Sequence, residues 1–135
     1  MTDRSKVTAY AQRAGEYPLP DAPHAVGRVE EPSCKDELVM GFRTHREIVT
    51  EIGFTLTPSA CPPLFACATT VVELVKGKPV LEAFLLKTAD IAAVLSTDGI
   101  LDAEHVHCAL MAELALKRMI TAYSEKKKAA LKGCR

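Results

Sequence analysis

Single, widely spaced cysteines constrain this chain more than any other feature of its sequence. Cys34, Cys61 and Cys108 lie in three separate segments, and His107 directly precedes the last of them. Thiolate and imidazole groups are typical ligands of Zn²⁺ and of iron–sulfur clusters. Small zinc fingers use paired Cys-x-x-Cys knuckles, and this sequence has none. Single ligands need a whole folded domain to bring them together, so we expect a site that the fold assembles and that keeps an accessible face.

Composition indicates one domain with free thiols. The chain has 135 residues, of which 48% are apolar, enough for a sizeable core. Its 17 basic and 17 acidic side chains cancel, so neither nucleic acid nor acidic lipid is an expected partner. No apolar run approaches the ~20 residues of a membrane span, and residues 1–5 lack the apolar segment of a signal peptide. Five cysteines cannot all pair internally, so we expect reduced thiols, no membrane association and a cytoplasmic location.

The residue pattern predicts an α+β domain in which a small sheet comes first and helices follow. Residues 1–24 are expected to form an N-terminal helix and loop, and residues 25–135 a single domain. Strand-forming residues between 25 and 57, interrupted by a polar stretch at 44–47, predict strands joined by a hairpin. Asp102 is the expected N-cap of the last helix, and Gly77 and Gly133 are expected beyond helix ends. Helices are expected at 4–13, 62–76, 79–86, 90–95 and about 103–131.

Cys61 and Cys67 are expected to differ although they are near neighbours. Cys61 precedes Pro62-Pro63, and proline favours the first turn of a helix, so Cys61 should lie at a helix N-terminus. The positive end of the helix dipole favours the thiolate form there. Cys67 lies six residues later, ~120° around the helix, among apolar neighbours. We therefore expect Cys61 to be a ligand and Cys67 to pack in the core.

The remaining candidates leave one ligand position open. Cys34 falls in a turn, and Asp36 can point to the same side if the backbone there is extended. His107 and Cys108 are neighbours on a helix and point ~100° apart, so both can bind one ion only if that turn is distorted. Cys34, Cys61 and Cys108 are thus the expected fixed ligands, and Asp36 and His107 are alternatives for the fourth.

Four motifs together resemble a known family. Cys34-Lys35-Asp36 is similar to a Cys-Gly-Asp motif, and Cys61 stands fifteen residues before the first lysine of Val75-Lys76-Gly77-Lys78. The segments 87–92 and 107–113, Lys-Thr-Ala-Asp-Ile-Ala and His-Cys-Ala-Leu-Met-Ala-Glu, are similar to Lys-Asn-Thr-Asp-Ile-Ala and His-Cys-Ser-x-Leu-Ala-Glu. Over roughly residues 25–125 the sequence resembles the U-type iron–sulfur cluster scaffolds, the IscU, NifU N-terminal and SufU group.

This resemblance implies a fold and a function. The implied fold is a small antiparallel three-stranded sheet packed against several helices. The implied function is an iron–sulfur cluster assembly scaffold, a carrier rather than an enzyme. It would accept sulfur and iron on Cys34, Cys61 and Cys108 and pass a transient [2Fe–2S] cluster to apo-proteins. Its expected partners are a cysteine desulfurase, an iron donor and apo-acceptor proteins, and homo-oligomers are left open.

The implied metal site comprises Cys34, Asp36, Cys61, His107 and Cys108. Zinc suits the same ligands, and the sequence does not decide which metal is resident. The alternative function is a zinc-bound sulfur acceptor or a structural zinc protein that does not build clusters. A zinc deaminase would need His-x-Glu followed by Pro-Cys-x-x-Cys. The stretch 45–47 matches the first motif, but Cys61 and Cys67 are six residues apart, so we do not expect a deaminase.

Three departures from the family pattern mark a divergent paralogue. Lys35 replaces a glycine and places a cation beside the site, and Pro62 replaces a second glycine and stiffens the backbone after Cys61. The stretch 101–105, Leu-Asp-Ala-Glu-His, replaces the Leu-Pro-Pro-Val-Lys segment to which a dedicated Hsp70 chaperone docks in the IscU branch. That chaperone is therefore not an expected partner.

Overall fold

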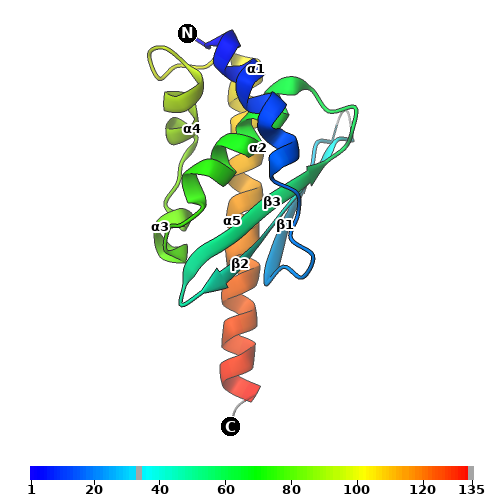
Figure 1. Ribbon diagram of the computed structural model, residues 1–135, viewed down its shortest axis with the longest axis vertical. Coiled ribbons are helices and arrows are strands. Elements are labelled where there is room, and N and C mark those ends of the chain that lie inside the picture. The colour runs from blue at the N-terminus through cyan, green and yellow to red at the C-terminus, as the bar shows by residue number, and fades with distance from the viewer. Residues whose placement is uncertain (33–34, 134–135) are drawn as a thin grey trace.

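The sheet is an antiparallel meander of three strands. The computed structural model describes residues 1–32 and 35–133, and in it β1 (Ala25–Glu30), β2 (Glu37–His45) and β3 (Ile48–Leu56) lie in the order β1-β2-β3 (Figure 1). The central strand places Met40 between Gly27 of β1 and Phe54 of β3. Side chains at every second position point to one face, and one face carries most of the sheet's buried apolar residues. The expected α+β class and three-stranded sheet are confirmed.

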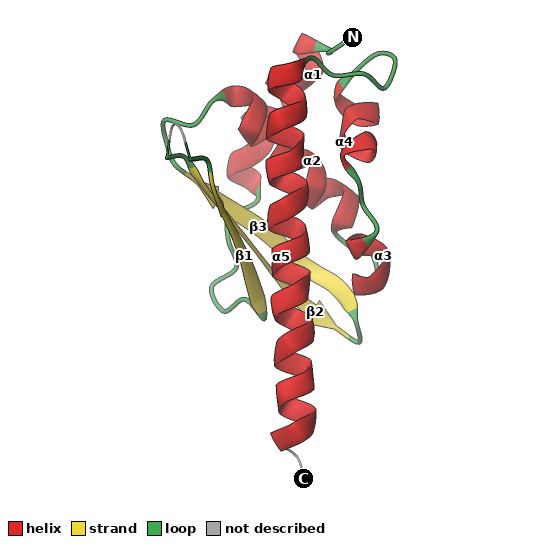
Figure 2. Ribbon diagram, turned by 180° about the vertical axis from the view of Figure 1, so that it is seen from behind, coloured by secondary structure: helices red, strands yellow, loops and turns green. Residues whose placement is uncertain are grey.

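Among the described residues, five α-helices and one 3-10 helix accompany this sheet. Helix α5 lies across one face of it (Figure 2) and extends beyond the sheet at its C-terminal end. Helix α2 packs against α1, α5 and β3, so it fills the space between them. No helix among the described residues is long and apolar enough to span a membrane. The elements are α1 (Arg4–Gln12), η1 (Arg13–Glu16), α2 (Pro62–Val75), α3 (Val80–Phe84), α4 (Thr88–Leu95) and α5 (Ala103–Gly133).

The helix boundaries follow local signals in the sequence. Pro62 opens α2, and Gly77, with a φ of 86°, follows its end as expected. Asp102 caps α5 by accepting a hydrogen bond from the backbone N–H of His105 at 3.0 Å. The end of α5 differs from the expectation, because the helix includes Gly133 rather than stopping near residue 131. A glycine is only a weak stop where the surrounding residues are good helix formers.

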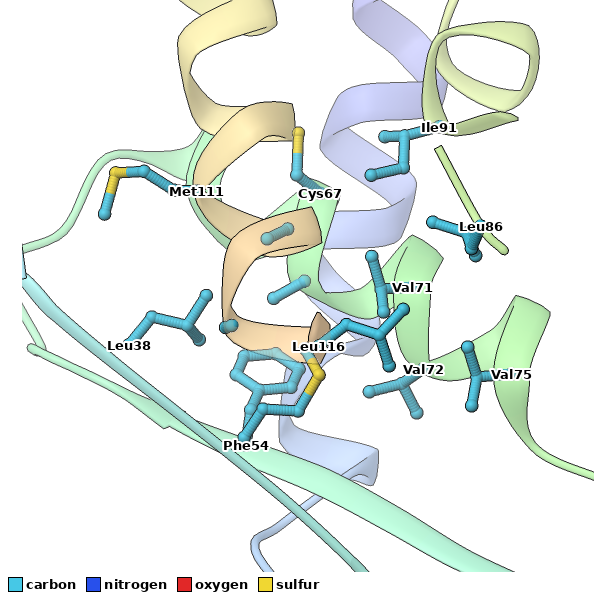
Figure 3. Close-up of a cluster of buried hydrophobic side chains, with 14 of the residues drawn as sticks. Leu38, Phe54, Cys67, Val71, Val72, Val75, Leu86, Ile91, Met111 and Leu116 are labelled. Carbon is cyan, nitrogen blue, oxygen red and sulfur yellow. The ribbon is translucent and has the colours of Figure 1, made fainter. Parts of the chain in front are cut away.

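The core lies between the buried face of the sheet, α2 and α5. Figure 3 shows Leu38 and Phe54 from the sheet facing Val72 of α2 and Leu116 of α5. Leu38 and Leu116 are wholly buried, and burial of each such side chain stabilises the fold by about 1.5–3 kcal/mol. At the other end of the core, the rings of Phe42 and Tyr123 meet edge to face, with centroids 5.3 Å apart.

Two glycines allow neighbouring segments to approach the sheet closely. A Cβ added to Gly27 would collide with the backbone oxygen of Ala115 in α5. A Cβ added to Gly53 on the opposite face would collide with the backbone oxygen of Pro18. The sheet is therefore covered on one face by α5 and on the other by the segment that follows η1.

The hairpin between β2 and β3 has a tight two-residue tip. Arg46 and Glu47 have φ values of 53° and 65°, as a type I′ turn requires at both central positions. Tertiary contacts hold these two residues in this left-handed conformation, which is unfavourable for residues other than glycine. The Glu47 backbone oxygen accepts a bond from the N–H of Val80 at 2.9 Å, and its carboxylate accepts one from the Tyr123 hydroxyl at 3.2 Å. The expected hairpin tip is confirmed, with a shorter turn than the four residues proposed.

The segment that follows α1 is attached to α2 by a charged cluster. Arg13 donates two hydrogen bonds to the Glu73 carboxylate, at 3.0 and 2.8 Å, and the Tyr17 hydroxyl donates a third at 2.8 Å. The hydrogen bonds from Arg13 hold the pKa of Glu73 below its ordinary value. Partial burial acts in the opposite direction, and the bond from Tyr17 adds to the lowering. The backbone N–H of Asp3 also bonds to the Leu95 oxygen at 2.8 Å. These contacts tie residues 1–17 to the helices, although the division at residue 24 stays a prediction.

We predict that Glu73→Gln destabilises the protein by about 1–2 kcal/mol near neutral pH, because a partly buried charged hydrogen-bond acceptor is lost. A carboxylate with a lowered pKa stabilises the fold above its ordinary pKa, and this contribution disappears as the pH falls through the lowered value. Urea unfolding of both proteins at decreasing pH should therefore show the difference shrinking in acid. Glu51→Gln is the control, since Glu51 is 62% exposed and its 3.9 Å pair with Arg43 contributes little. A constant difference at every pH would contradict this account.

Candidate functional site

Cys61 caps helix α2, as expected from the two prolines that follow it. Its φ and ψ of −69° and 148° are extended, and its backbone oxygen accepts a 3.0 Å hydrogen bond from the N–H of Leu64. The side chain is partly exposed. The β3–α2 connection that carries Cys61 lies at the same end of the molecule as the start of α5 (Figure 1). The fold therefore brings the second and the third cysteine-bearing segments together.

Cys61 and Cys108 form the centre of the site. Their Sγ atoms lie 3.9 Å apart, and Cys108 is only 4% exposed. Two thiolates at about 2.3 Å from one tetrahedral Zn²⁺ stand about 3.8 Å apart, so this separation fits two ligands of one metal ion. It is far longer than the ~2.05 Å of a disulfide, and both thiols are free. The pair thus offers two soft sulfur ligands with the spacing that one metal needs.

The environment keeps Cys108 protonated without a cation. Burial, and then the neighbouring Cys61 and Cys67, raise the pKa of the Cys108 thiol. A bound cation reverses this effect, because it stabilises the thiolate and displaces the proton. Binding of a metal ion at Cys108 would therefore release the proton of its thiol.

Cys67 has a different role from these two thiols. It is wholly buried on α2, and burial followed by the nearby Cys61 raises the pKa of its thiol to about 12. Figure 3 draws Cys67 among the apolar side chains of the core. The expectation that Cys67 packs in the core is confirmed.

His107 contacts an acidic residue on another segment. Its Nε2 lies 2.7 Å from Oε2 of Glu31, which directly follows β1. His105 turns elsewhere and bonds to Asp102 at 2.5 Å, so the two histidines do not form one pair of ligands. The sequence analysis did not find Glu31. Its place before Pro32 carries no recognisable signal, and its partner is 76 positions away in the chain.

The complete ligand set stays a prediction. Among residues 1–32 and 35–133, no three His, Cys, Asp or Glu side chains gather closely enough to hold a metal ion. Cys34, the first expected ligand, lies outside the described residues. The structure brings Cys61 and Cys108 together, and Asp36 and His107 stay the predicted alternatives for the fourth ligand.

The segment before β2 is closed by two backbone hydrogen bonds. The N–H of Glu31 donates to the Asp36 oxygen at 2.9 Å, and the N–H of Lys35 donates to the Glu31 oxygen at 2.8 Å. Lys35 has a φ of 63°, in the left-handed region where a side chain is strained. This lysine replaces the glycine of the motif that the sequence resembles, and glycine adopts such a φ without strain.

Comparison with known proteins establishes the family. The sequence matches the family model described as NifU-like N terminal domain over residues 10–130. The chain belongs to this family. It is 30% identical over 118 residues to the iron-sulfur cluster assembly scaffold protein IscU of Escherichia coli K12, covering 87% of this chain and 88% of that protein. It is 33% identical over 98 residues to the iron-sulfur cluster assembly protein IscU of Plasmodium falciparum, covering 73% of this chain but only 57% of that protein.

Solved structures with similar folds agree with this membership. The N-terminal part of a NifU-like protein from Brucella abortus superposes with a TM-score of 0.68 at 15% identity, covering 90% of this chain and 93% of that one. A putative scaffold protein for the SUF system from Fervidobacterium islandicum gives a TM-score of 0.65 at 16% identity, covering 85% and 93%. At these identities the likeness concerns the fold, and it supports the U-type scaffold architecture expected from the sequence.

We predict that iodoacetamide modifies Cys61 at least about tenfold faster than Cys67 at about pH 8. A thiol with a pKa of about 12 is less than ~0.1% ionised at that pH, and Cys67 is also shielded by the core. Tandem mass spectrometry of the alkylated peptides would give both rates. In urea the two cysteines should react alike, which controls for intrinsic differences. Equal rates in the folded protein would contradict the buried position of Cys67.

We also predict that Lys35→Gly stabilises the protein by about 0.5–1 kcal/mol. Relief of the ~1–2 kcal/mol cost of a left-handed residue exceeds the ~0.4–1 kcal/mol lost to the greater freedom of glycine in the unfolded chain. Lys35→Ala is the matched control, because it removes the same charge but keeps the Cβ. Urea unfolding should rank the glycine variant above both other proteins. If alanine stabilises as much as glycine, charge rather than backbone strain is the cause.

Proposed function

We propose that this protein is an iron–sulfur cluster assembly scaffold that accepts sulfur and iron on Cys34, Cys61 and Cys108. The observation that carries the proposal is the pair of free thiols, Cys61 and Cys108, with Sγ atoms 3.9 Å apart at the start of α2 and α5. Two relatives also support the proposal, because the E. coli and P. falciparum proteins are both described as iron–sulfur cluster assembly proteins. The cluster is the cargo of the protein and not a resident cofactor.

The chemistry of the thiols suits such a carrier. Cys61 is accessible enough to meet a sulfur donor, and Cys108 is shielded from solvent. Thiolates bind ferrous iron, and a fourth ligand from Asp36 or His107 would hold it less strongly than a fourth thiolate. We infer that a transient [2Fe–2S] cluster forms here, that zinc can bind the same ligands, and that the protein is a carrier rather than an enzyme.

The proposal implies a set of partners and a compartment. A cysteine desulfurase would supply sulfur, a separate donor would supply iron, and apo-acceptor proteins would take the finished cluster. Free thiols with these roles need a reducing environment, so we place the protein in the cytoplasm. The replacement of the Hsp70 docking segment by residues 101–105 argues against that chaperone as a partner.

The second candidate is a zinc-bound sulfur acceptor or structural zinc protein that does not build clusters. The strained backbone at Lys35 and the proline after Cys61 favour it, since both reduce the flexibility that release of a cluster requires. The two candidates bind metal with the same sulfurs, so zinc binding alone does not separate them. Assembly of an iron–sulfur chromophore does.

We predict that anaerobic incubation with ferrous iron, cysteine and a cysteine desulfurase produces the visible absorbance of an iron–sulfur cluster. Cys61→Ser and Cys108→Ser should each reduce that absorbance at least about tenfold, because each removes a thiolate ligand. Cys67→Ala should leave it nearly unchanged, since Cys67 packs in the core, and it serves as the matched control. Zinc binding without any chromophore would favour the second candidate. Equal losses in the Cys61 and Cys67 variants would refute the site.

A further inference from the structure

Cys61 and Cys108 are placed for a reaction that needs no metal ion. Their sulfur atoms are 3.9 Å apart, although the two residues are 47 positions apart in the chain. The described cysteines are Cys61, Cys67 and Cys108, and of these only the first and the last are in hydrogen-bonding contact. A disulfide joins sulfurs ~2.05 Å apart, so a closing movement of about 2 Å would turn this contact into a covalent bond.

The two thiols differ in how freely they can make this movement. Cys61 precedes α2 on an extended backbone, with φ and ψ of −69° and 148°, and its side chain is partly exposed. Cys108 lies in the second turn of α5, and its side chain is buried. Packed interiors resist displacement of their side chains. The closing movement therefore falls on Cys61, which rotates toward a fixed partner.

The unequal exposure of the two thiols also sets the order in which they react. A small oxidant from solvent meets the partly exposed Cys61 before the buried Cys108. Redox-sensitive cysteines are commonly accessible thiols placed next to a second, resolving cysteine. The resolving thiol converts the first oxidation product into a disulfide before irreversible oxidation can follow. Cys61 and Cys108 have this arrangement of an accessible thiol beside a shielded one.

From this geometry we propose that Cys61 and Cys108 form a reversible disulfide switch, in which a hydroperoxide oxidises Cys61 and Cys108 resolves the product. In the first step the Cys61 thiol takes one oxygen atom from hydrogen peroxide, becomes a sulfenic acid and leaves one water. In the second step the Cys108 thiol attacks the Cys61 sulfur, the disulfide forms, and the hydroxyl group departs as a second water. The two thiols lose two electrons to the O–O bond, and a dithiol reductant restores them by thiol–disulfide exchange.

The disulfide would close the candidate site to its chemistry. The thiolate is the nucleophile and the metal ligand, and a sulfur in a disulfide is neither. Oxidation therefore removes Cys61 as an acceptor of sulfur and Cys108 as its partner in one step. Sulfur or metal bound at either thiol would in turn protect the pair from oxidation. This consequence rests on the proposed function, whereas formation of the disulfide depends only on the two thiols.

Cys67 provides a matched control on the same helix. It lies six residues after Cys61 and is wholly buried. Cys67→Ala removes a thiol near the pair and leaves both of its members in place. Chymotrypsin cleaves after Phe65, so it separates the peptides that carry Cys61 and Cys67. A cross-link to Cys108 is then assigned to one of them without ambiguity.

The experiment treats the reduced, metal-free full chain with a few equivalents of hydrogen peroxide. Intact mass should fall by two hydrogen atoms without dimer formation, and dithiothreitol should restore it. Non-reducing chymotryptic digestion and tandem mass spectrometry should give the Cys61–Cys108 cross-link at least about fivefold above any other pairing. In Cys108→Ser, dimedone should trap the Cys61 sulfenic acid at least about fivefold more than in wild type, because the resolving thiol is missing. Cys67→Ala should match wild type.

A second variant tests the pair without altering it. The combination of Cys34→Ser, Cys67→Ala and Cys134→Ser leaves Cys61 and Cys108 as the only thiols. It should form the same reversible disulfide as wild type. Urea unfolding checks that each variant retains the fold. Zn²⁺ affinity, measured by competition with a chromophoric chelator, should be at least about tenfold weaker in oxidised than in reduced wild type, because the thiolates are lost.

The results that would overturn the switch are distinct from failure of the scaffold function. Cross-linking of Cys61 mainly to Cys34 or Cys67 would overturn it, as would equal trapping of sulfenic acid in wild type and Cys108→Ser. Equal zinc affinity of the oxidised and reduced proteins would also overturn it. If no cluster assembles but the Cys61–Cys108 disulfide forms reversibly, the scaffold function fails and the switch stands. If clusters assemble and peroxide gives no such disulfide, the scaffold stands and the switch fails.

Discussion

The packing of α5 against the sheet and α2 determines where the site cysteines lie. Ala112 and Ala115 are wholly buried on the inner side of α5, and their small side chains allow the strands and α2 to approach the helix closely. Gly27 completes this contact, because any larger residue would collide with the helix backbone at Ala115. Cys108 extends the same buried side toward the N-terminus of α5. The close packing of α5 in the core therefore brings the Cys108 sulfur to 3.9 Å from the Cys61 sulfur.

Burial alone does not show whether a cysteine is a candidate ligand. Cys67 and Cys108 are buried almost equally, and burial raises the pKa of both thiols. Cys67 is wholly buried and lies among the apolar side chains of the core. Cys108 lies 3.9 Å from a partly exposed sulfur at a helix N-terminus. The candidate ligand therefore differs from the core cysteine in its contact with a second thiol that is partly exposed to solvent.

Local chemistry made much of the fold predictable from the sequence. Pro62, Gly77 and Asp102 act within a few residues of their own position, and each marks the helix boundary expected of it. Strand-forming residues between 25 and 57 likewise indicated the strands, because β-branched and aromatic side chains favour a pleated, half-buried backbone. The end of α5 was less predictable, since a glycine near a helix end can fall either inside the last turn or just beyond it.

Contacts between distant segments were not predictable in this way. Arg13 and Glu73 are 60 positions apart, and Glu31 and His107 are 76 apart, with no spacing or motif that links them. We expected Cys61 and Cys108 to converge because each is a single candidate ligand and because the sequence resembles a family, while nothing in their local sequence specifies a shared site. Pairings of this kind depend on the assembled core, and a single sequence contains no record of them.

The two glycine replacements near the site have different physical consequences. Lys35 keeps a left-handed backbone, with a φ of 63°, in which glycine would be unstrained. The conformation persists because the backbone of Glu31 bonds to both Lys35 and Asp36. Strain is thus retained beside the candidate ligands while an ammonium group is added, so the electrostatics change more than the backbone shape.

Pro62 acts in the opposite way, because its fixed φ matches the first turn of α2 and its missing N–H would have no partner within the helix there. The second replacement stiffens the backbone after Cys61 without strain, and only the first stores energy that a change in the site can release.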